Sequence, residues 1–132
     1  MTKNDETIAR QLLETLAQVT DLFHNSAVTV ERNNKVSKTV NSVEFIKSAT
    51  GPMLTGYLDA ELKDGTAVSW LLDVTWTNHA WTIEARLARS TIKGQETIQE
   101  LPTESVDEFA HLVRGLLKIV NQLLALRTPE LS

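Results

Sequence analysis

The sequence predicts an α+β fold in which an antiparallel meander sheet of four to six strands carries two amphipathic helices on one face, one from each end of the chain. Apolar residues recur with the helical period at both ends of the chain and alternate with polar residues in the middle. Turn residues divide that middle part into hairpins. A length of 132 residues is typical of one domain, so we expect residues 1–132 to form a single α+β domain.

Residues 5–24 predict the first helix. At a spacing of about 100° per residue, five apolar side chains fall on one stripe and charged residues lie opposite. The stripe consists of Ile8, Leu12, Leu16, Val19 and Phe23. This helix therefore has one face to bury.

Between residues 27 and 101 the apolar period becomes two, and β-branched residues and tryptophans accumulate. The clearest strands are 54–62, 66–76 and 80–89. A strand is also expected at 27–32, with weaker ones at 36–40 and 95–101. Residues 42–49 are followed by Gly51 and Pro52, so this segment is either a strand or a short helix.

The apolar pattern selects the register of two hairpins, because a slip of one residue would send every side chain to the other face. A three-residue loop at 63–65, with Gly65 left-handed, sets Ala60 opposite Val68 and Leu58 opposite Trp70. A two-residue loop would mix the two faces. The turn at Asn78 similarly sets apolar residues against each other on the same face. A third turn near Gly94 is expected, with its register open.

The last helix is expected to begin at a capping box, Ser105 to Glu108, and to end near Arg127, before Pro129. Its apolar side chains span an arc of roughly 180 to 200°, whereas a helix on one sheet needs little more than about 100°. Two arrangements would cover the remainder. Either the first helix packs alongside, or a second subunit does.

Two sets of candidate binding residues follow from these registers. The inner face could enclose an apolar ligand between sheet and helices, although tryptophans on such a face more often form packed core. The ligand candidates are Trp70, Trp76, Trp81, Leu58 and Leu72. On the outer face and the wide helix arc, aromatic and aliphatic residues could dock a partner. The partner candidates are Tyr57, Leu71, Arg86, Leu112 and Ile119.

The outer face also places Asp73 opposite Glu84, next to Arg86. Paired carboxylates suit acid and base chemistry when their pKa values differ. A solvated polar face of a half-covered sheet predicts the same residues, and we favour that interpretation. No nucleophile elbow, glycine-rich phosphate loop or paired histidine spacing occurs, so we expect no metal and no cofactor, and we favour a protein without enzymatic activity.

Composition excludes further classes. The net charge of −4 disfavours a nucleic-acid surface, which needs clustered Lys and Arg. The absence of cysteine excludes disulfides and a thiol nucleophile. The polar, acidic amino terminus lacks the features of a signal peptide, and no apolar run could cross a bilayer. A cytoplasmic protein without a membrane partner is the expectation.

Small size, mild acidity and a strongly amphipathic last helix resemble the secretion chaperones and immunity proteins of bacteria, which act by binding another protein. The resemblance implies a binding role. Secretion chaperones place a helix between their strands, for which 42–49 is the candidate here. The leading hypothesis is a non-catalytic protein-interaction module (adaptor, chaperone-like or immunity-like), with a homodimer as one form. The alternative is a small-molecule binder or enzyme that uses the tryptophan-lined interior.

Overall fold

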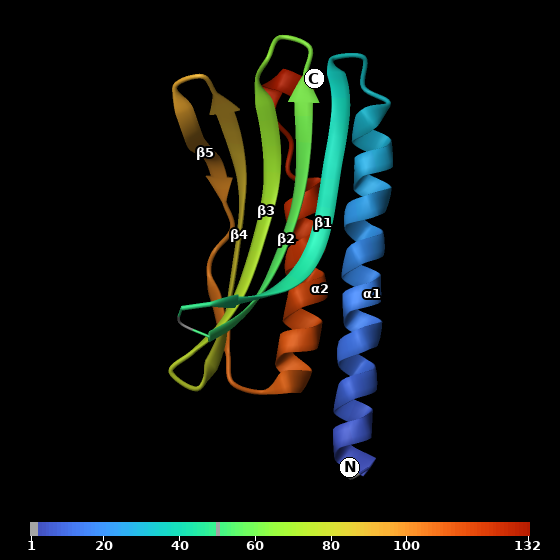
Figure 1. Cartoon of the computed structure of the whole chain (residues 1–132), viewed down its shortest axis with the longest axis vertical. Helices are drawn as coiled ribbons and strands as arrows, with labels where there is room; N and C mark the ends of the chain where they lie inside the picture. Colours follow the sequence, from blue (N-terminus) through green and yellow to red (C-terminus); the bar gives the residue numbers. More distant parts are fainter. Residues whose placement is uncertain (1–2, 50) are drawn as a thin grey trace.

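The computed structural model describes residues 3–49 and 51–132, and it shows two helices on one side of an antiparallel sheet (Figure 1). The helices are α1 (Lys3–Glu31), α2 (Phe109–Ala125) and the short 3-10 helix η1 (Pro129–Leu131). The strands are β1 (Val36–Ser48), β2 (Gly51–Leu62), β3 (Ala67–Thr77), β4 (Ala80–Thr91), β5 (Gly94–Glu100) and β6 (Glu104–Val106). The predicted α+β meander with terminal helices on one face is confirmed.

The sheet runs in the order β1-β2-β3-β4-β5, and β6 also pairs with β4. β4 is covered along its far edge by β5, then by a hydrogen bond from the Leu101 N–H to the Ala85 carbonyl (3.0 Å), and then by β6. β1 lies at the other end of the sheet. β1 therefore has a strand neighbour on one side, β2, whereas β4 has neighbours on both sides.

Both predicted hairpin registers are confirmed. Leu58 pairs with Trp70, and Trp70 pairs in turn with Leu87, so one apolar face continues across β2, β3 and β4. Gly65 has φ +93°, and Asn78 and His79 have φ of 52° and 64°, as the two tight turns require. The third turn pairs Thr91 with Gly94, and a register shift lies between Leu87 and Ala88.

α1 is longer than expected, and the strand predicted at 27–32 is wrong. The β-branched residues from Val28 to Val30 favour a strand locally, but Ala27 continues the buried stripe of the helix and is only 3% exposed. Val30 packs against the same core. Burial of a continuous apolar stripe of the helix outweighs the weak preference of these β-branched residues for a strand.

Residues 42–49, which the pattern left open, belong mainly to β1. Val43 pairs with Gly56 and Phe45 with Leu54, so β1 and β2 form a long hairpin. Figure 1 shows the far end of this hairpin bending across the neighbouring strands. The structure therefore has no helix at the position where secretion chaperones would carry one.

The capping box predicted at Ser105 is also not formed. Ser105 lies in β6 and pairs with Thr82, and α2 begins at Phe109. Glu108 occupies the N-cap position with extended backbone and makes no side-chain capping bond. Pairing with β4 extends this segment and delays the helix by about one turn.

α1 lies alongside α2, and both helices run in the same direction (Figure 1). The wide apolar arc of α2 faces the sheet and α1 together, so the first of the two expected arrangements is found. The residues of α2 that it buries are Leu112, Leu116, Ile119, Val120 and Leu123.

A candidate binding groove between the helices

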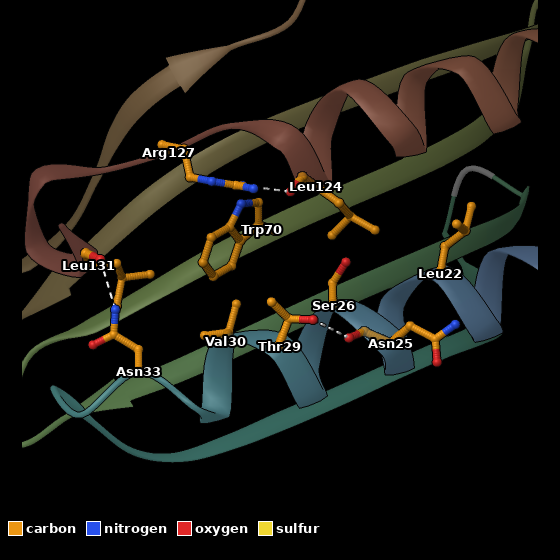
Figure 2. Close-up of a pocket in the computed structure, with 10 residues that line it drawn as sticks. All are labelled: Leu22, Asn25, Ser26, Thr29, Val30, Asn33, Trp70, Leu124, Arg127 and Leu131. Atoms are coloured by element: carbon orange, nitrogen blue, oxygen red, sulfur yellow. Dashed lines mark hydrogen bonds between the residues drawn. The ribbon is translucent and has the colours of Figure 1, made fainter.

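The carboxy-terminal halves of α1 and α2 enclose a groove of about 390 Å³, with Trp70 of β3 at its floor (Figure 2). Four half-buried aliphatic side chains line it: Leu22, Val30, Leu124 and Leu131. Its polar lining consists of Asn25, Ser26, Thr29, Asn33 and Arg127. The groove thus combines an apolar interior with a polar rim.

Trp70 joins the sheet to the end of α2. Its indole is only 2% exposed, and its Nε1–H donates a hydrogen bond to the Leu126 carbonyl (3.3 Å). A buried indole needs such a partner, and a carbonyl beyond the last helical turn provides it. This bond holds the chain after α2 against the floor of the groove.

Arg127 lies at the rim of the groove (Figure 2). Its Nη1 donates to the carbonyls of Leu124 (3.0 Å) and Leu126 (3.1 Å), which satisfies acceptors at the helix end. Among the described residues, no carboxylate forms an ion pair with this guanidinium. A positive charge is therefore available beside an apolar groove.

The carboxy-terminal segment closes one end of the groove. The Asn33 side-chain amide donates to the Leu131 carbonyl (2.8 Å), and the Lys35 ammonium donates to the carbonyl of Ser132. Two contacts from the loop between α1 and β1 therefore hold this end of the chain.

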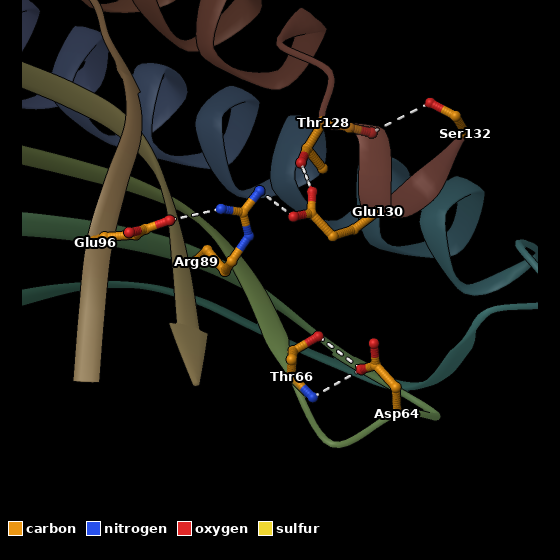
Figure 3. Close-up of polar contacts among 7 residues, drawn as sticks. All are labelled: Asp64, Thr66, Arg89, Glu96, Thr128, Glu130 and Ser132. Atoms are coloured by element: carbon orange, nitrogen blue, oxygen red, sulfur yellow. Dashed lines mark hydrogen bonds and ion pairs between the residues drawn. The ribbon is translucent and has the colours of Figure 1, made fainter. Parts of the chain in front are cut away.

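Arg89 fixes the same segment from the sheet side (Figure 3). Its guanidinium contacts Glu96 of β5 (2.6 Å) and also Glu130 of η1, whose carboxylate accepts a hydrogen bond from the Thr128 hydroxyl. Burial alone would raise the pKa of Glu130, but the Thr128 hydroxyl and the charge of Arg89 together hold that pKa below its usual value. The groove is therefore framed by an ionic contact between distant parts of the chain.

The five predicted ligand residues do not gather at one cavity. Trp70 lines the groove, whereas Leu58 and Leu72 are completely buried in the core. Trp76 and Trp81 pack against each other near the β3–β4 turn, with ring centroids 4.8 Å apart. Register alone placed all of these residues on one face, but distance along the strands separates them.

The predicted outer-face residues do lie together. Leu71 pairs with both Tyr57 and Arg86, and Asp73 pairs with Glu84. A hollow of about 60 Å³ lies beside them. The Arg86 guanidinium donates to side chains of β5, Thr97 Oγ1 (3.0 Å) and Gln95 Oε1 (2.8 Å), and Asp73 accepts from Thr55 (3.1 Å). The face is a hydrogen-bonded polar surface with a small hollow.

The other two partner candidates, Leu112 and Ile119, are 5% and 2% exposed. Both lie within the core formed by α2 and the sheet, so neither offers a free surface in this fold. The wide apolar arc of α2 that suggested these two residues is covered by the sheet and α1 together.

The groove residues Asn33, Arg127 and Leu131 were not predicted from the sequence. Arg127 and Pro129 marked only the end of the last helix. Nothing in the local pattern indicates that Asn33 meets Leu131, because the two lie 98 positions apart. Only the folded chain brings them together.

Comparison with protein-family models gives no match, and comparisons with curated proteins and with solved structures give no significant match. Across residues 3–49 and 51–132, no helix is long and apolar enough to span a membrane. The same part of the chain contains no group of three or more histidines and carboxylates placed to hold a metal ion.

Proposed function

We propose that the chain is a non-catalytic protein-interaction module that binds an apolar segment of another polypeptide in the groove between α1 and α2. The observation that carries this proposal is the groove itself, in which aliphatic side chains of α1, α2 and η1 lie around the indole of Trp70. Apolar surface between helices is a common docking site for an amphipathic segment.

The shape of the groove favours a polypeptide over a small molecule. Small ligands usually lose about 70–90% of their surface to an enclosing pocket. This groove is partly open to solvent and not an enclosed cavity, so a longer occupant would cover more of its aliphatic lining. Arg127 at the rim further favours an occupant with an acidic residue beside its apolar ones.

A displayed library of amphipathic peptides, selected on the purified chain, tests this proposal. We expect enriched peptides to carry apolar residues at helical spacing together with Asp or Glu. Arg127→Glu should weaken their binding about tenfold or more, since it places like charges opposite each other. Arg10→Glu is the matched control, because it reverses an exposed charge on α1 at a position that does not line the groove.

Peptides that bind wild type and Arg127→Glu equally would contradict a role for this groove. Circular dichroism of both variants checks that each charge reversal leaves the fold intact.

A second candidate is a small apolar anion in the same groove, since about 390 Å³ falls within the usual range of about 300–1,000 Å³ for ligand sites. The probe 1-anilinonaphthalene-8-sulfonate is apolar and anionic. Saturable binding of one probe per chain that Arg127→Glu abolishes would favour this function, and unsaturable binding that the variant leaves unchanged would count against it.

A further inference from the structure

β1 forms an open end of the sheet, whereas β4 is covered by β5, Leu101 and β6 along its far edge. β1 is 13 residues long, and its strand pairing is with β2. In the part of the chain that the structure describes, no backbone hydrogen bond from another element reaches the free edge of residues 38–47. A long open edge is a template for pairing with another strand.

The surface around this edge is unusually apolar. Val40, Phe45 and Ile46 of β1 are 44%, 55% and 42% exposed. On α1, Leu13 is 67% exposed and lies on the side that faces away from α2. Exposed apolar side chains that gather around an unpaired strand indicate a surface that another chain covers.

The charges along β1 indicate that the chain covering this surface is a second copy of the same protein. Lys38 and Glu44 lie on the outer face of the same strand, opposite Glu61 and Thr55 of β2. Lys38 contacts Glu61 at 3.8 Å, an exposed pair of little energetic weight, and Glu44 has no ion pair among the described residues. An antiparallel pairing of two β1 strands about a two-fold axis at Asn41 sets Lys38 of each copy opposite Glu44 of the other.

The position of α1 is compatible with this pairing. α1 packs on β1 and β2, where the Phe23 ring lies against Gly56 and Val43. The two-fold axis would lie half a strand spacing beyond β1. A helix that packs over the line between β1 and β2 is then about one strand spacing from the axis and about 10 Å from its copy, a distance at which helices pack. The side of α1 facing its copy carries Ala9, Leu13 and Thr20 and no charged residue between them.

We infer that this chain forms a homodimer by antiparallel pairing of β1 with β1 of a second copy, centred on Asn41 and flanked by the two copies of α1. The two sheets then form one continuous sheet with both pairs of helices on the same face. This interface is distinct from the groove, so the dimer does not depend on the proposed peptide site.

Charge exchange tests the inference by sedimentation equilibrium. Lys38→Glu and Glu44→Lys should each raise the dimer dissociation constant about tenfold or more, since like charges then lie directly opposite. The double variant with both substitutions should restore dimerisation close to wild type. Lys93→Glu, on the β4–β5 turn, is the matched control and should dimerise like wild type.

Cross-linking tests the register. The chain has no cysteine, so Asn41→Cys introduces a single thiol at the proposed axis. Oxidation should yield a covalent dimer, because paired strands bring the two Cα atoms within disulfide range. Thr97→Cys on β5 should form no disulfide-linked dimer under the same conditions, because this position lies outside the proposed interface.

A wild-type chain that stays monomeric at tens of micromolar would overturn the inference. So would a dimer that neither single charge reversal weakens, or single reversals that the double variant does not rescue. Peptide binding to the groove is measured separately with Arg127→Glu, so failure of the dimer and failure of the proposed function remain distinguishable.

Discussion

Gly56 shows how closely the core is fitted around single side chains. It lies on the inner face of β2, and a Cβ atom there would come within 3.2 and 3.3 Å of the Phe23 ring. Phe23 is completely buried, so the ring has little room to move away. The missing side chain is what allows α1 to lie this close to the sheet.

We therefore expect Gly56→Ala to lower the free energy of unfolding by about 1–3 kcal/mol through overpacking. Urea unfolding followed by circular dichroism measures this change. Gly115→Ala in α2 is the control, because a Cβ there meets its nearest neighbours at 3.5 and 3.7 Å, which is ordinary contact. It should raise the free energy of unfolding by up to about 1 kcal/mol, since alanine favours a helix over glycine. A stabilising Gly56→Ala would contradict the close fit.

His79 is held in a left-handed conformation, with φ of 64°, at the second central position of the β3–β4 turn. Such a conformation is costly for most residues with a side chain and costs glycine little. His79→Gly is expected to raise the free energy of unfolding by about 0.5–1 kcal/mol, because Asn-Gly suits this turn type. Thermal unfolding measures the effect, and Asn78→Val, which puts a β-branched residue at φ 52°, should shift stability the opposite way. Loss of stability in His79→Gly would show that the imidazole makes a contact that outweighs the turn strain.

Among the elements, the registers of the two hairpins formed by β2, β3 and β4 were predicted more accurately than the ends of the helices. Alternation of apolar residues selected the pairing of Ala60 with Val68 and of Val74 with Ile83, because any slip would bury polar groups. The ends of α1 and α2 depend instead on what lies nearby. Residues 28–30 continue the helix because Ala27 and Val30 pack on the core, and Ser105 becomes part of a strand because the edge of β4 is free to pair.

The start of α2 offers a direct test of this interpretation. Glu108 occupies the N-cap position without a side-chain capping bond. The shorter side chain in Glu108→Asp can accept from the first turn, so we expect a gain of about 0.5–1 kcal/mol in the free energy of unfolding. Chemical unfolding measures it, and Asp107→Glu, one position earlier, should be close to neutral. Equal effects of the two substitutions would argue against a helix start at this position.

Across the whole molecule, residues far apart in sequence hold the carboxy-terminal segment in place. Arg89 of β4 contacts both Glu96 and Glu130, and Asn33 reaches Leu131 (Figure 3 shows the arginine contacts). These contacts anchor the segment that contains Leu131, one wall of the groove. The site and the global stability of the fold are therefore linked.

This linkage predicts that the free energy of unfolding depends on pH in the acidic range. The pKa of Glu130 in the folded chain is held below its unfolded value of about 4.3. The carboxylate therefore contributes to the free energy of unfolding above that pH, and this contribution is lost as the pH falls through the folded pKa. Glu130→Gln should be less stable than wild type at pH 7, and the difference should shrink as pH falls from about 5 to 3. Urea unfolding across this range measures it. A constant difference would show that the charge of Glu130 does not carry the effect.

Asp64 also contributes stability that is present when its carboxyl group is ionised and is lost in acid. Its carboxylate accepts from the backbone N–H (2.9 Å) and the hydroxyl (2.7 Å) of Thr66, and these two bonds lower its pKa. Asp64→Asn removes the acid-sensitive contribution of the β2–β3 turn, and Glu130→Gln removes that of the carboxy-terminal segment. Only Glu130→Gln should alter peptide binding to the groove.

The fold class, the two hairpin registers and the inner face followed from the sequence, because they depend on periodicity and on local turn geometry. Trp70 and Leu58 could be assigned to one face in that way. The groove could not be predicted, because Asn33, Arg127 and Leu131 meet only after α1, α2 and η1 pack around Trp70. Likewise, the apolar arc of α2 indicated a missing cover, but the packing of the chain shows that α1 supplies it and that β1 keeps an open edge.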